Sequence, residues 1–582
     1  MPTLEWIGKA KVVNHHLEVP YRVLERQYSY DENGRHDDDN GSENMIIHGD
    51  NLEALKSLLP KYEGRVKCIY IDPPYNTGNE GWVYNDNVND PHIKKWLGTV
   101  VGKEGEDLSR HDKWLCMMYP RLKLLQKLLS DDGAIFISID DTEYANLKLI
   151  CDEIFGSNCF VSNISWQRTY STRNDSKGIV NEVEHIIVYS KQPNWNPSKL
   201  ARTEEMDQRY SSPDNDPRPW KAGDASAPGA ATHPGMVYAI QHPITGKLLY
   251  PPNGRHWTFG QEQMLQIMLH WSYYELRPID DYEKRVSICG QSNTVPKEIN
   301  AIMLSAPLEE LASKAVLRYQ IGKWPVLYFT SGGRGGIACK RYLEEMGGRI
   351  VTNLWPYDEV GHTDEAAKVL KAIFDGKSPF DTPKPPRLIE RILQIVGDNN
   401  ALILDSFAGS GTTAHAVLNM NKADGGDRRF ILIEMGDYAD RITAERVKRV
   451  IDGYGEGRQA MAGTGGSFSY YELGEPLMYG DMLNENVGVE KIREYVYFTD
   501  TKSRLEEPHP DEPYFMGVHV NSAYYFYYEK KKATTLNREF LHTVKTKADA
   551  YVIYADLCTL SDAELEKYHI TFKKIPRDIT KL

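Results

Sequence analysis

The sequence predicts an α/β fold with a mostly parallel β-sheet that is covered by helices on both faces. Strand and helix patterns alternate in two separate stretches, residues 43–191 and 351–452, and such alternation is typical of parallel sheets. In each stretch, one predicted strand runs directly into a motif that is suited to ligand binding. Ligand sites of α/β proteins lie at the carboxyl ends of the strands, so both motifs favour the same fold class.

The first α/β stretch, residues 43–191, shows the alternation element by element. Short apolar runs predict strands, and apolar residues at helical spacing predict helices. The predicted strands are residues 45–48, 66–71, 134–139 and 183–190. The predicted helices are residues 51–59, 113–129 and 142–155. Pro60 is expected to end the first helix, and Asp131-Asp132-Gly133 predicts a turn before the third strand.

The second α/β stretch, residues 351–452, has the same rhythm. It predicts strands at 402–405 and 429–434 and helices at 412–420 and 438–451.

Composition divides the rest of the chain into three further parts. Residues 1–42 form an N-terminal arm with an acidic loop, and the sequence leaves open whether this arm clasps the core or binds a partner. Residues 192–350 are rich in Pro, Gly, Asn and Trp, which predicts an inserted, loop-rich module. Residues 453–582 begin with a Gly-rich linker and continue as a separate C-terminal α+β module.

Composition and charge limit the class of protein. The formal net charge of −13 over 582 residues by itself disfavours a nucleic-acid partner, although acids crowd one short polar stretch, residues 31–43. The seven cysteines form no Cys-x-x-Cys pair, so we expect no disulfide framework and no metal site. No stretch is long and apolar enough to span a bilayer, and no secretory signal is visible. We therefore expect a cytoplasmic protein without membrane contact.

A glycine-rich turn follows the strand predicted at 402–405. Gly409, Gly411 and Ala414 fit the spacing of a turn that binds the adenosine part of a cofactor, and Glu434 ends the next strand, where it can accept from ribose hydroxyls. No lysine precedes the threonine pair, which disfavours a phosphate-binding P-loop. By itself the turn leaves open an ordinary strand–helix connection and a nicotinamide dehydrogenase.

An acidic corner, Asp72-Pro73-Pro74-Tyr75, follows the buried strand 66–71. Two prolines end strand pairing and hold the backbone extended, so the corner is expected at the carboxyl edge of the sheet. The set suits the exocyclic amine of a nucleobase: Asp72 accepts one amine hydrogen, the Pro73 carbonyl accepts the other, and Tyr75 stacks on the base. A base inside a duplex cannot reach these groups, so base flipping is implied. A structural Pro-Pro turn is the plain alternative, and the glycine turn with Glu434 disfavours it.

At these residues the sequence resembles the amino-methyltransferases of DNA, and in detail the modification subunits of type III restriction-modification systems. The resemblance covers about residues 44–451, and the order of the motifs, with the acidic corner before the glycine turn, is similar to the β class. It implies a Rossmann-like S-adenosylmethionine-dependent methyltransferase core, S-adenosyl-L-methionine as the cofactor and adenine N6 as the target. In such enzymes the middle module, here residues 192–350, recognises the target sequence.

The resemblance also implies the site residues. His48-Gly49-Asp50-Asn51 and Asp381-Thr382-Pro383-Lys384-Pro385 are similar to family segments near the cofactor, and residues 181–191 are similar to the strand that closes the target-base pocket. The implied catalytic residues are Asp72, Pro73, Pro74 and Tyr75. The implied cofactor-binding residues are Asp50, Lys384, Asp405, Phe407, Ala408, Gly409, Gly411, Thr412 and Glu434.

The middle module carries basic residues interleaved with aromatic ones, a composition that suits phosphate contacts and support of unstacked bases. The expected DNA-binding residues are Arg202, Arg209, Arg218, Lys221, Arg255 and Trp257. For any single one of them, a place on an ordinary surface loop is the plain alternative.

The resemblance implies double-stranded DNA as substrate, a homodimer, and a restriction (helicase-nuclease) subunit as a partner, which the sequence leaves open. One alternative is a cytosine-N4 DNA methyltransferase. Another is a catalytically silent DNA-recognition subunit, which the intact acidic corner and glycine turn disfavour. A dehydrogenase leaves Asp72-Pro73-Pro74-Tyr75 without a role.

Overall fold

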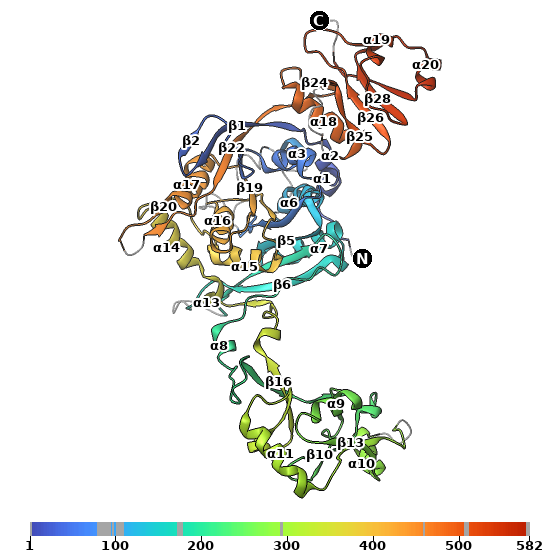
Figure 1. The fold of residues 1–582 in the computed structure, drawn as a ribbon. Coiled ribbons are helices and arrows are strands. Elements are labelled where there is room, and N and C mark those ends of the chain that lie inside the picture. The colour runs from blue at the N-terminus through green and yellow to red at the C-terminus, as the bar shows by residue number, and fades with distance from the viewer. Residues whose placement is uncertain are drawn as a thin grey trace. The chain divides into compact units, whose positions relative to one another are not determined.

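The computed structural model describes residues 3–77, 95, 98–100, 110–171, 179–290, 295–457, 460–503, 505 and 511–577. The chain divides into two compact units (Figure 1). The first unit is Met1–Ser198 with Val351–Leu582, and the second is Lys199–Ile350.

One large sheet forms the centre of the first unit. In the described part of the chain it has eleven strands in the order β17-β6-β7-β5-β4-β18-β19-β3-β22-β1-β2. The strands are β1 (Arg22–Asp31), β2 (Gly34–His36), β3 (Met45–His48), β4 (Val66–Ile71), β5 (Leu129–Ile139), β6 (Phe160–Gln167), β7 (Val183–Ser190), β17 (Leu354–Trp355), β18 (Leu402–Asp405), β19 (Arg429–Glu434) and β22 (Ser467–Pro476). The six strands from β5 to β22 in this order pair in parallel, whereas β7 pairs antiparallel with β5 and with β6.

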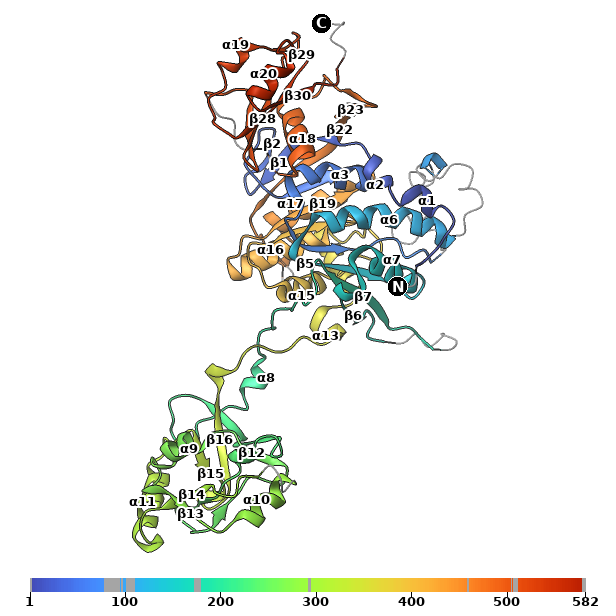
Figure 2. The same ribbon diagram turned by 90° about the vertical axis from the view of Figure 1, so that its right-hand side faces the viewer.

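Helices cover both faces of this sheet (Figures 1 and 2). One face carries α3 (Asn51–Tyr62), α6 (Arg110–Leu128) and α7 (Tyr144–Phe155), and the other carries α14 (Thr363–Ile373), α15 (Pro386–Val396), α16 (Thr412–Asp424) and α17 (Glu445–Asp452). Side chains alternate along each strand, so Ile69 and Ile71 of β4 pack in one apolar core with Leu55 of α3 and Leu122 of α6. The predicted α/β class is confirmed. In the described ranges, no helix is long and apolar enough to cross a membrane.

The pairing of β18 with β4 positions the two predicted motifs. These strands are parallel and adjacent, with Ile403 opposite Cys68 and Leu404 opposite Ile69. Their carboxyl ends therefore lie side by side at one edge of the sheet. The acidic corner follows β4 and the glycine turn follows β18, so the fold brings both motifs to the same place.

The N-terminal arm and the segment after residue 466 belong to the sheet, whereas the sequence predicted them as separate parts. β22 pairs in parallel with β3, and β1 pairs antiparallel with β22. Most residues of β1 are partly exposed and two register irregularities interrupt its pairing, so its sequence lacks a clean alternation of apolar and polar residues.

Two local predictions were wrong. α3 continues through Pro60 to Tyr62, because Leu59, Pro60 and Tyr62 are buried and the missing N–H costs only one bond in the last turn. β5 begins at Leu129 instead of residue 134. Val66 lies opposite Leu129 and Cys68 opposite Ala134, so residues 130–133 form a bulge where a turn was expected.

The C-terminal part of the first unit carries a second, four-stranded sheet in the order β25-β26-β28-β30. Its elements are α18 (Val489–Thr501), β25 (Phe515–His519), β26 (Ser522–Phe526), β28 (Ala550–Ala555), α20 (Asp562–Lys567) and β30 (Ile570–Lys574).

The second unit has its own apolar core, which includes Trp220, Trp257, Trp271 and Phe329. Its main elements are β8 (Trp220–Asp224), β9 (Ser226–Pro228), β10 (Ile240–Gln241), β12 (Arg255–Trp257), α9 (Gln261–Met268), β13 (Tyr274–Pro278), α10 (Tyr282–Cys289), β14 (Asn300–Leu304), α11 (Leu308–Ile321), β15 (Leu327–Phe329) and β16 (Ile337–Tyr342). The unit begins at Lys199 instead of the predicted residue 192, because the chain before it still packs on the first unit, where the Ser198 N–H donates to the Ile395 carbonyl at 2.7 Å.

A buried ion cluster links distant segments of the second unit. The fully buried Lys340 ammonium donates to Asp214 at 2.6 Å and to Asp216 at 2.7 Å. The Trp220 indole N–H also donates to Asp214, at 2.8 Å. Removing one member of such a pair leaves a buried charge without its partner.

We expect Asp214→Ala to lower the free energy of unfolding of the second unit by about 3–5 kcal/mol, the usual cost of breaking a buried pair. Urea denaturation of the full chain, followed by tryptophan fluorescence, measures this loss. Arg277→Ala is the control, because the Arg277–Glu275 pair of the same unit is exposed, and we expect it to cost less than about 1 kcal/mol. Equal effects of the two variants contradict the prediction.

Candidate active site

A pocket at the carboxyl ends of β4 and β18 is lined by residues of the glycine turn and by Asp72 of the acidic corner. The other predicted catalytic residues, Pro73, Pro74 and Tyr75, do not line it. Its lining residues are Tyr70, Asp72, Phe380, Thr382, Pro383, Lys384, Asp405, Phe407, Ala408, Gly409, Ser410, Thr412 and Thr413. Asp72 and the glycine turn therefore share one pocket, although more than 300 residues separate them in the sequence. Of the predicted cofactor-binding residues, Asp50, Gly411 and Glu434 do not line it.

Asp72 is buried, with 7% of its surface exposed, and both of its carboxylate oxygens accept hydrogen bonds. The Tyr75 hydroxyl donates to Oδ1 at 2.8 Å, and the Lys384 ammonium donates to Oδ2 at 2.7 Å. Lys384 also donates to the Tyr75 hydroxyl at 2.9 Å. Burial raises the pKa of Asp72, and the Lys384 ammonium opposes that rise. Burial also acts to lower the pKa of Lys384, but the nearby carboxylates of Asp72 and Glu184 raise it above its ordinary value, so Lys384 stays charged.

Glu184 adds a second buried carboxylate to this corner, and the sequence did not single it out. It lies near the start of β7, and because β7 runs antiparallel to β5 its first residues reach the edge where β4 and β18 end. Its Oε2 accepts from the Tyr75 hydroxyl at 3.2 Å and lies 3.6 Å from the Lys384 ammonium. Its Oε1 accepts from Arg168 at 2.8 Å. The sequence held one signal for this strand, the resemblance of residues 181–191 to the strand that closes the target-base pocket, but that resemblance did not identify Glu184.

Neighbouring side chains hold the acidic corner in place. The Trp114 indole N–H donates to the Pro74 carbonyl at 2.6 Å. Asn76 has a left-handed backbone (φ 61°), and its amide donates to the buried carboxylate of Glu143. These contacts set the direction in which the chain leaves the corner, and hence the position of Tyr75.

The glycine turn depends on a left-handed backbone and on Glu434. Gly409 and Gly411 have φ values of 52° and 83°. A Cβ atom added to Gly409 would lie only 3.1 Å from the Phe380 ring, so a larger residue would be crowded there. Glu434 is fully buried, and its carboxylate accepts from the backbone N–H groups of Gly409 at 2.8 Å and Gly436 at 2.7 Å. Glu434 thus braces the turn, and its predicted contact with a ribose stays a prediction.

A buried arginine, Arg446 of α17, supports the turn from behind. Its guanidinium donates to the hydroxyls of Ser410 at 2.7 Å and Thr412 at 2.8 Å. Burial lowers the pKa of Arg446 to about 10. The sequence reasoning missed this residue, because an arginine at helical spacing beyond the motif looks like an ordinary surface residue.

The remaining predicted residues lie elsewhere. Asp50 caps α3, accepting from the Leu52 and Glu53 N–H groups. In the second unit, the predicted basic residues are partly or fully exposed, and several are paired, such as Arg202 with Asp207 and Arg255 with Asp224. Trp257 is different: it is 4% exposed in the unit's core, and its indole N–H donates to the Tyr238 carbonyl at 2.9 Å. Its burial corrects the expectation of a direct contact between Trp257 and DNA.

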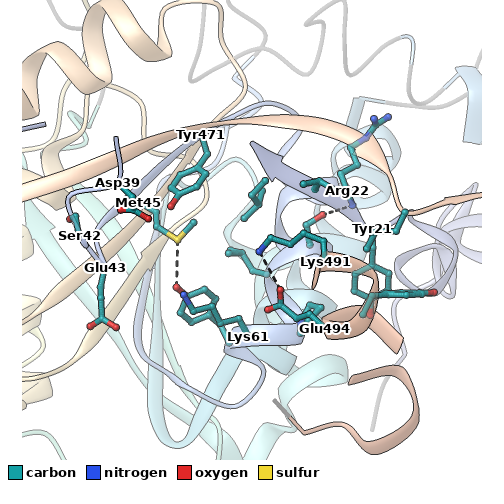
Figure 3. Close-up of a pocket in the computed structure, with 18 of the residues that line it drawn as sticks. Tyr21, Arg22, Asp39, Ser42, Glu43, Met45, Lys61, Tyr471, Lys491 and Glu494 are labelled. Atoms are coloured by element: carbon teal, nitrogen blue, oxygen red, sulfur yellow. Dashed lines mark hydrogen bonds and ion pairs between the residues drawn. The ribbon is translucent and has the colours of Figure 1, made fainter. Parts of the chain in front are cut away.

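Another pocket in the first unit is lined by residues of β1, α3, β22 and α18 (Figure 3). Lys491 pairs with Glu494 at its wall, and the Tyr62 hydroxyl contacts the Met45 sulfur. None of the predicted catalytic or cofactor-binding residues lines it, so the pocket at Asp72 is the candidate active site. In the described ranges, no group of three or more His, Cys, Asp or Glu side chains is placed to hold a metal ion.

The fold and the pocket define an α/β protein with a cofactor-binding glycine turn beside a buried acid. Residues 66–445 match the DNA methylase family, and this match covers more than half of the chain. The chain belongs to that family, which confirms the resemblance to the amino-methyltransferases of DNA.

Individual relatives agree. The Mod subunit of the type III restriction-modification enzyme StyLTI from Salmonella typhimurium is 33% identical over 70% of this chain and 57% of its own length. The EcoP15I Mod subunit from Escherichia coli is 29% identical over 78% of this chain and 66% of its own length. The type II methyltransferase M.KpnI from Klebsiella pneumoniae is 31% identical over 67% of this chain and 80% of its own length. This chain thus spans about three fifths of the length of the two Mod subunits.

The buried Asp405 predicts a pH-dependent stability. It accepts from the Phe407 N–H at 3.0 Å and from the Thr413 hydroxyl, and burial raises its pKa to about 7 from the ordinary 3.8. Below pH 3.8 this acid is protonated in both the folded and the unfolded chain. As the pH rises to 7 the unfolded chain ionises first, so the free energy of unfolding falls through this window by up to about 4 kcal/mol.

Asp405→Asn removes that contribution. We therefore expect the difference in unfolding free energy between the variant and the wild type to move in favour of the variant as the pH rises from 4 to 8. Urea denaturation at several pH values measures it. A lost hydrogen bond shifts all the values equally, so a difference that does not change with pH contradicts the raised pKa.

Proposed function

We propose that this protein is a site-specific DNA methyltransferase that transfers the methyl group of S-adenosyl-L-methionine to the N6 amine of adenine in double-stranded DNA after base flipping. The observation that carries the proposal is the shared pocket of Asp72 and the glycine turn in a chain of the DNA methylase family.

The pocket residues fit the proposed cofactor. The backbone of the glycine turn is left-handed, and Gly409 has no side chain. The space that a larger side chain would fill is therefore open, and a ligand can approach the backbone closely. Phe407, Ala408, Ser410 and Thr412 line this pocket and would hold the cofactor. When bound, S-adenosyl-L-methionine supplies a methyl group on a positively charged sulfur.

The acidic corner prepares the amine for this methyl group. The lone pair of the adenine amine is delocalised into the ring, which makes the nitrogen a poor nucleophile. Asp72 accepts one amine hydrogen and the Pro73 carbonyl accepts the other, so the nitrogen becomes pyramidal and its lone pair turns toward the methyl group. A carboxylate in a water-poor site is a strong acceptor, and this positioning accounts for most of the proposed rate enhancement.

Cytosine N4 is the second candidate target, because its exocyclic amine poses the same chemical problem. The acid at position 72 favours adenine. Methylation-sensitive sequencing of DNA from cells that express this chain, with mass spectrometry of the modified nucleosides, identifies the base and the recognition sequence together. Unmodified DNA in both measurements contradicts the proposed activity and supports the silent DNA-recognition subunit.

We assign target recognition to residues 199–350, with Arg202, Arg209, Arg218, Lys221 and Arg255 as candidate DNA contacts. Their positive charges suit phosphate groups, which hold a protein in register on the duplex. We also propose a homodimer and a restriction (helicase-nuclease) subunit as partners, and a cytoplasmic place in a restriction-modification system. The names of the Mod subunits among the relatives support the restriction-modification system and its second subunit, and the homodimer rests on the family resemblance alone.

We expect Asp72→Ala to lower the methylation rate by at least about 10²–10³-fold, the usual cost of removing a group that acts on the reacting atoms. DNA affinity stays within about twofold, because Asp72 is a buried acid and makes no phosphate contact in the proposal. Tritium transfer to DNA and a filter-binding assay measure the two quantities. The exposed Asp427→Ala is the control. A variant that methylates at a near wild-type rate removes Asp72 from the mechanism.

We expect Glu434→Ala to raise the dissociation constant of S-adenosyl-L-methionine by roughly tenfold or more. The glycine turn loses the charge-assisted hydrogen bond from the Gly409 N–H, and the segment after β19 loses the one from the Gly436 N–H. Each such bond contributes about 1.5–3 kcal/mol, and 1.4 kcal/mol corresponds to a factor of ten. Isothermal titration measures the constant. Glu472→Ala is the control, because Glu472 lies within β22 opposite His48 and its carboxylate pairs with that histidine instead of with the glycine turn. An unchanged constant for Glu434→Ala contradicts the bracing role.

A further inference from the structure

The oxygen atoms of Asp72 are already engaged in this structure. Tyr75 donates to one and Lys384 to the other, at 2.8 and 2.7 Å. The proposed function requires the same carboxylate to accept a hydrogen from the target amine. The Lys384 ammonium also lies in the pocket where the positively charged sulfur of the cofactor is expected. Binding of the cofactor and the target base therefore favours a second position for the Lys384 ammonium, away from Asp72.

Glu184 offers that second place. Its Oε2 lies 3.6 Å from the Lys384 ammonium, so a shift of about 1 Å gives a normal hydrogen bond. The same oxygen is 3.2 Å from the Tyr75 hydroxyl, which has a single hydrogen and can donate to only one carboxylate at a time. A move of both donors from Asp72 to Glu184 frees both oxygens of Asp72 for the amine.

The charges of the corner are consistent with this exchange. The cations Lys384 and Arg168 balance the two carboxylates of Asp72 and Glu184, and Arg168 bonds the far oxygen of Glu184. The exchange moves Lys384 from one carboxylate to the other, so no buried charge loses its partner. Glu184 is 5% exposed, and a buried carboxylate at this point is costly unless it has such partners.

We propose that Glu184 is a positioning residue of the proposed methyltransferase. It accepts hydrogen bonds from the Lys384 ammonium and the Tyr75 hydroxyl when the target amine donates to Asp72. This inference rests on the proposed function. It concerns the exchange of hydrogen-bond donors before the methyl transfer, and no covalent bond changes in it.

The test measures how much the exocyclic amine contributes to binding, without catalysis. Two duplexes carry the recognition sequence found by sequencing, one with the natural target base and one with the same base lacking its exocyclic amine. Their dissociation constants are measured with sinefungin, an unreactive analogue of the cofactor. The ratio of the two constants is compared between proteins, so the different pairing strength of the two bases cancels.

We expect Glu184→Gln to lower this ratio about tenfold relative to the wild type, since Lys384 then stays on Asp72 and competes with the amine for the carboxylate oxygens. Its affinity for sinefungin stays within twofold of the wild type. Glu184→Asp keeps the charge and restores part of the ratio. In a Lys384→Met background, Glu184→Gln changes the ratio by a smaller factor than it does when Lys384 is present, because only the Tyr75 hydroxyl remains for Glu184 to receive.

Glu512→Gln is the matched control. Glu512 is also 5% exposed and accepts from a tyrosine hydroxyl, that of Tyr525 at 2.8 Å, but it lies in the C-terminal part of the first unit. We expect its ratio to equal that of the wild type.

Three outcomes overturn the inference. In the first, Glu184→Gln keeps the wild-type ratio. In the second, it weakens both duplexes equally, which indicates a merely structural role. In the third, the effect of Glu184→Gln is the same with and without Lys384. A wild-type protein that neither methylates DNA nor distinguishes the duplexes overturns the proposed function itself, so the two failures are distinguishable.

Discussion

The parallel pairing of β4 with β18 is the constraint on which the candidate site depends. The two strands lie far apart along the chain but are neighbours in the sheet, with Ile403 opposite Cys68. Their parallel pairing brings the corner after β4 and the turn after β18 to one edge. The chain between them includes the whole second unit. Such an insertion costs little in chain entropy, because the cost of closing a loop grows only with the logarithm of its length. A separate inserted unit is therefore compatible with an undisturbed sheet.

The corner around Asp72 holds more buried charge than is favourable for the stability of the fold. Asp72, Glu184 and Lys384 are all buried, and burial of charged groups is unfavourable unless each has partners. Apolar residues of similar volume pack in such a corner at less cost. A buried carboxylate is nevertheless a stronger hydrogen-bond acceptor than one in water, since no solvent competes for it. The arrangement is therefore explained by chemistry at the site, and the ion pairs with Lys384 and Arg168 limit its cost.

Sequence patterns predicted the central strands well and the edges of the sheet poorly. The predicted residues of β3, β4, β7, β18 and β19 coincide with the observed strands. Strands that are buried on both faces are mostly apolar runs, and turn residues mark where such runs begin and end. β1 was missed, since a strand that is partly exposed and irregular has mixed polarity. The pairing of β22 with β3 is a long-range contact for which no local pattern exists.

The site shows the same limit at the level of single side chains. Motif spacing identified Asp72, Tyr75 and the glycine turn, because their neighbours in sequence are also their neighbours in space. Glu184 reaches the corner only through the order of strands β4, β5 and β7, so no spacing rule finds it. Trp257 is the converse case. A tryptophan two residues after an arginine looks like a nucleic-acid contact, but its side chain is buried in the core of the second unit. Residue type indicates which chemistry is available, and the pairing of strands decides which residues take part in it.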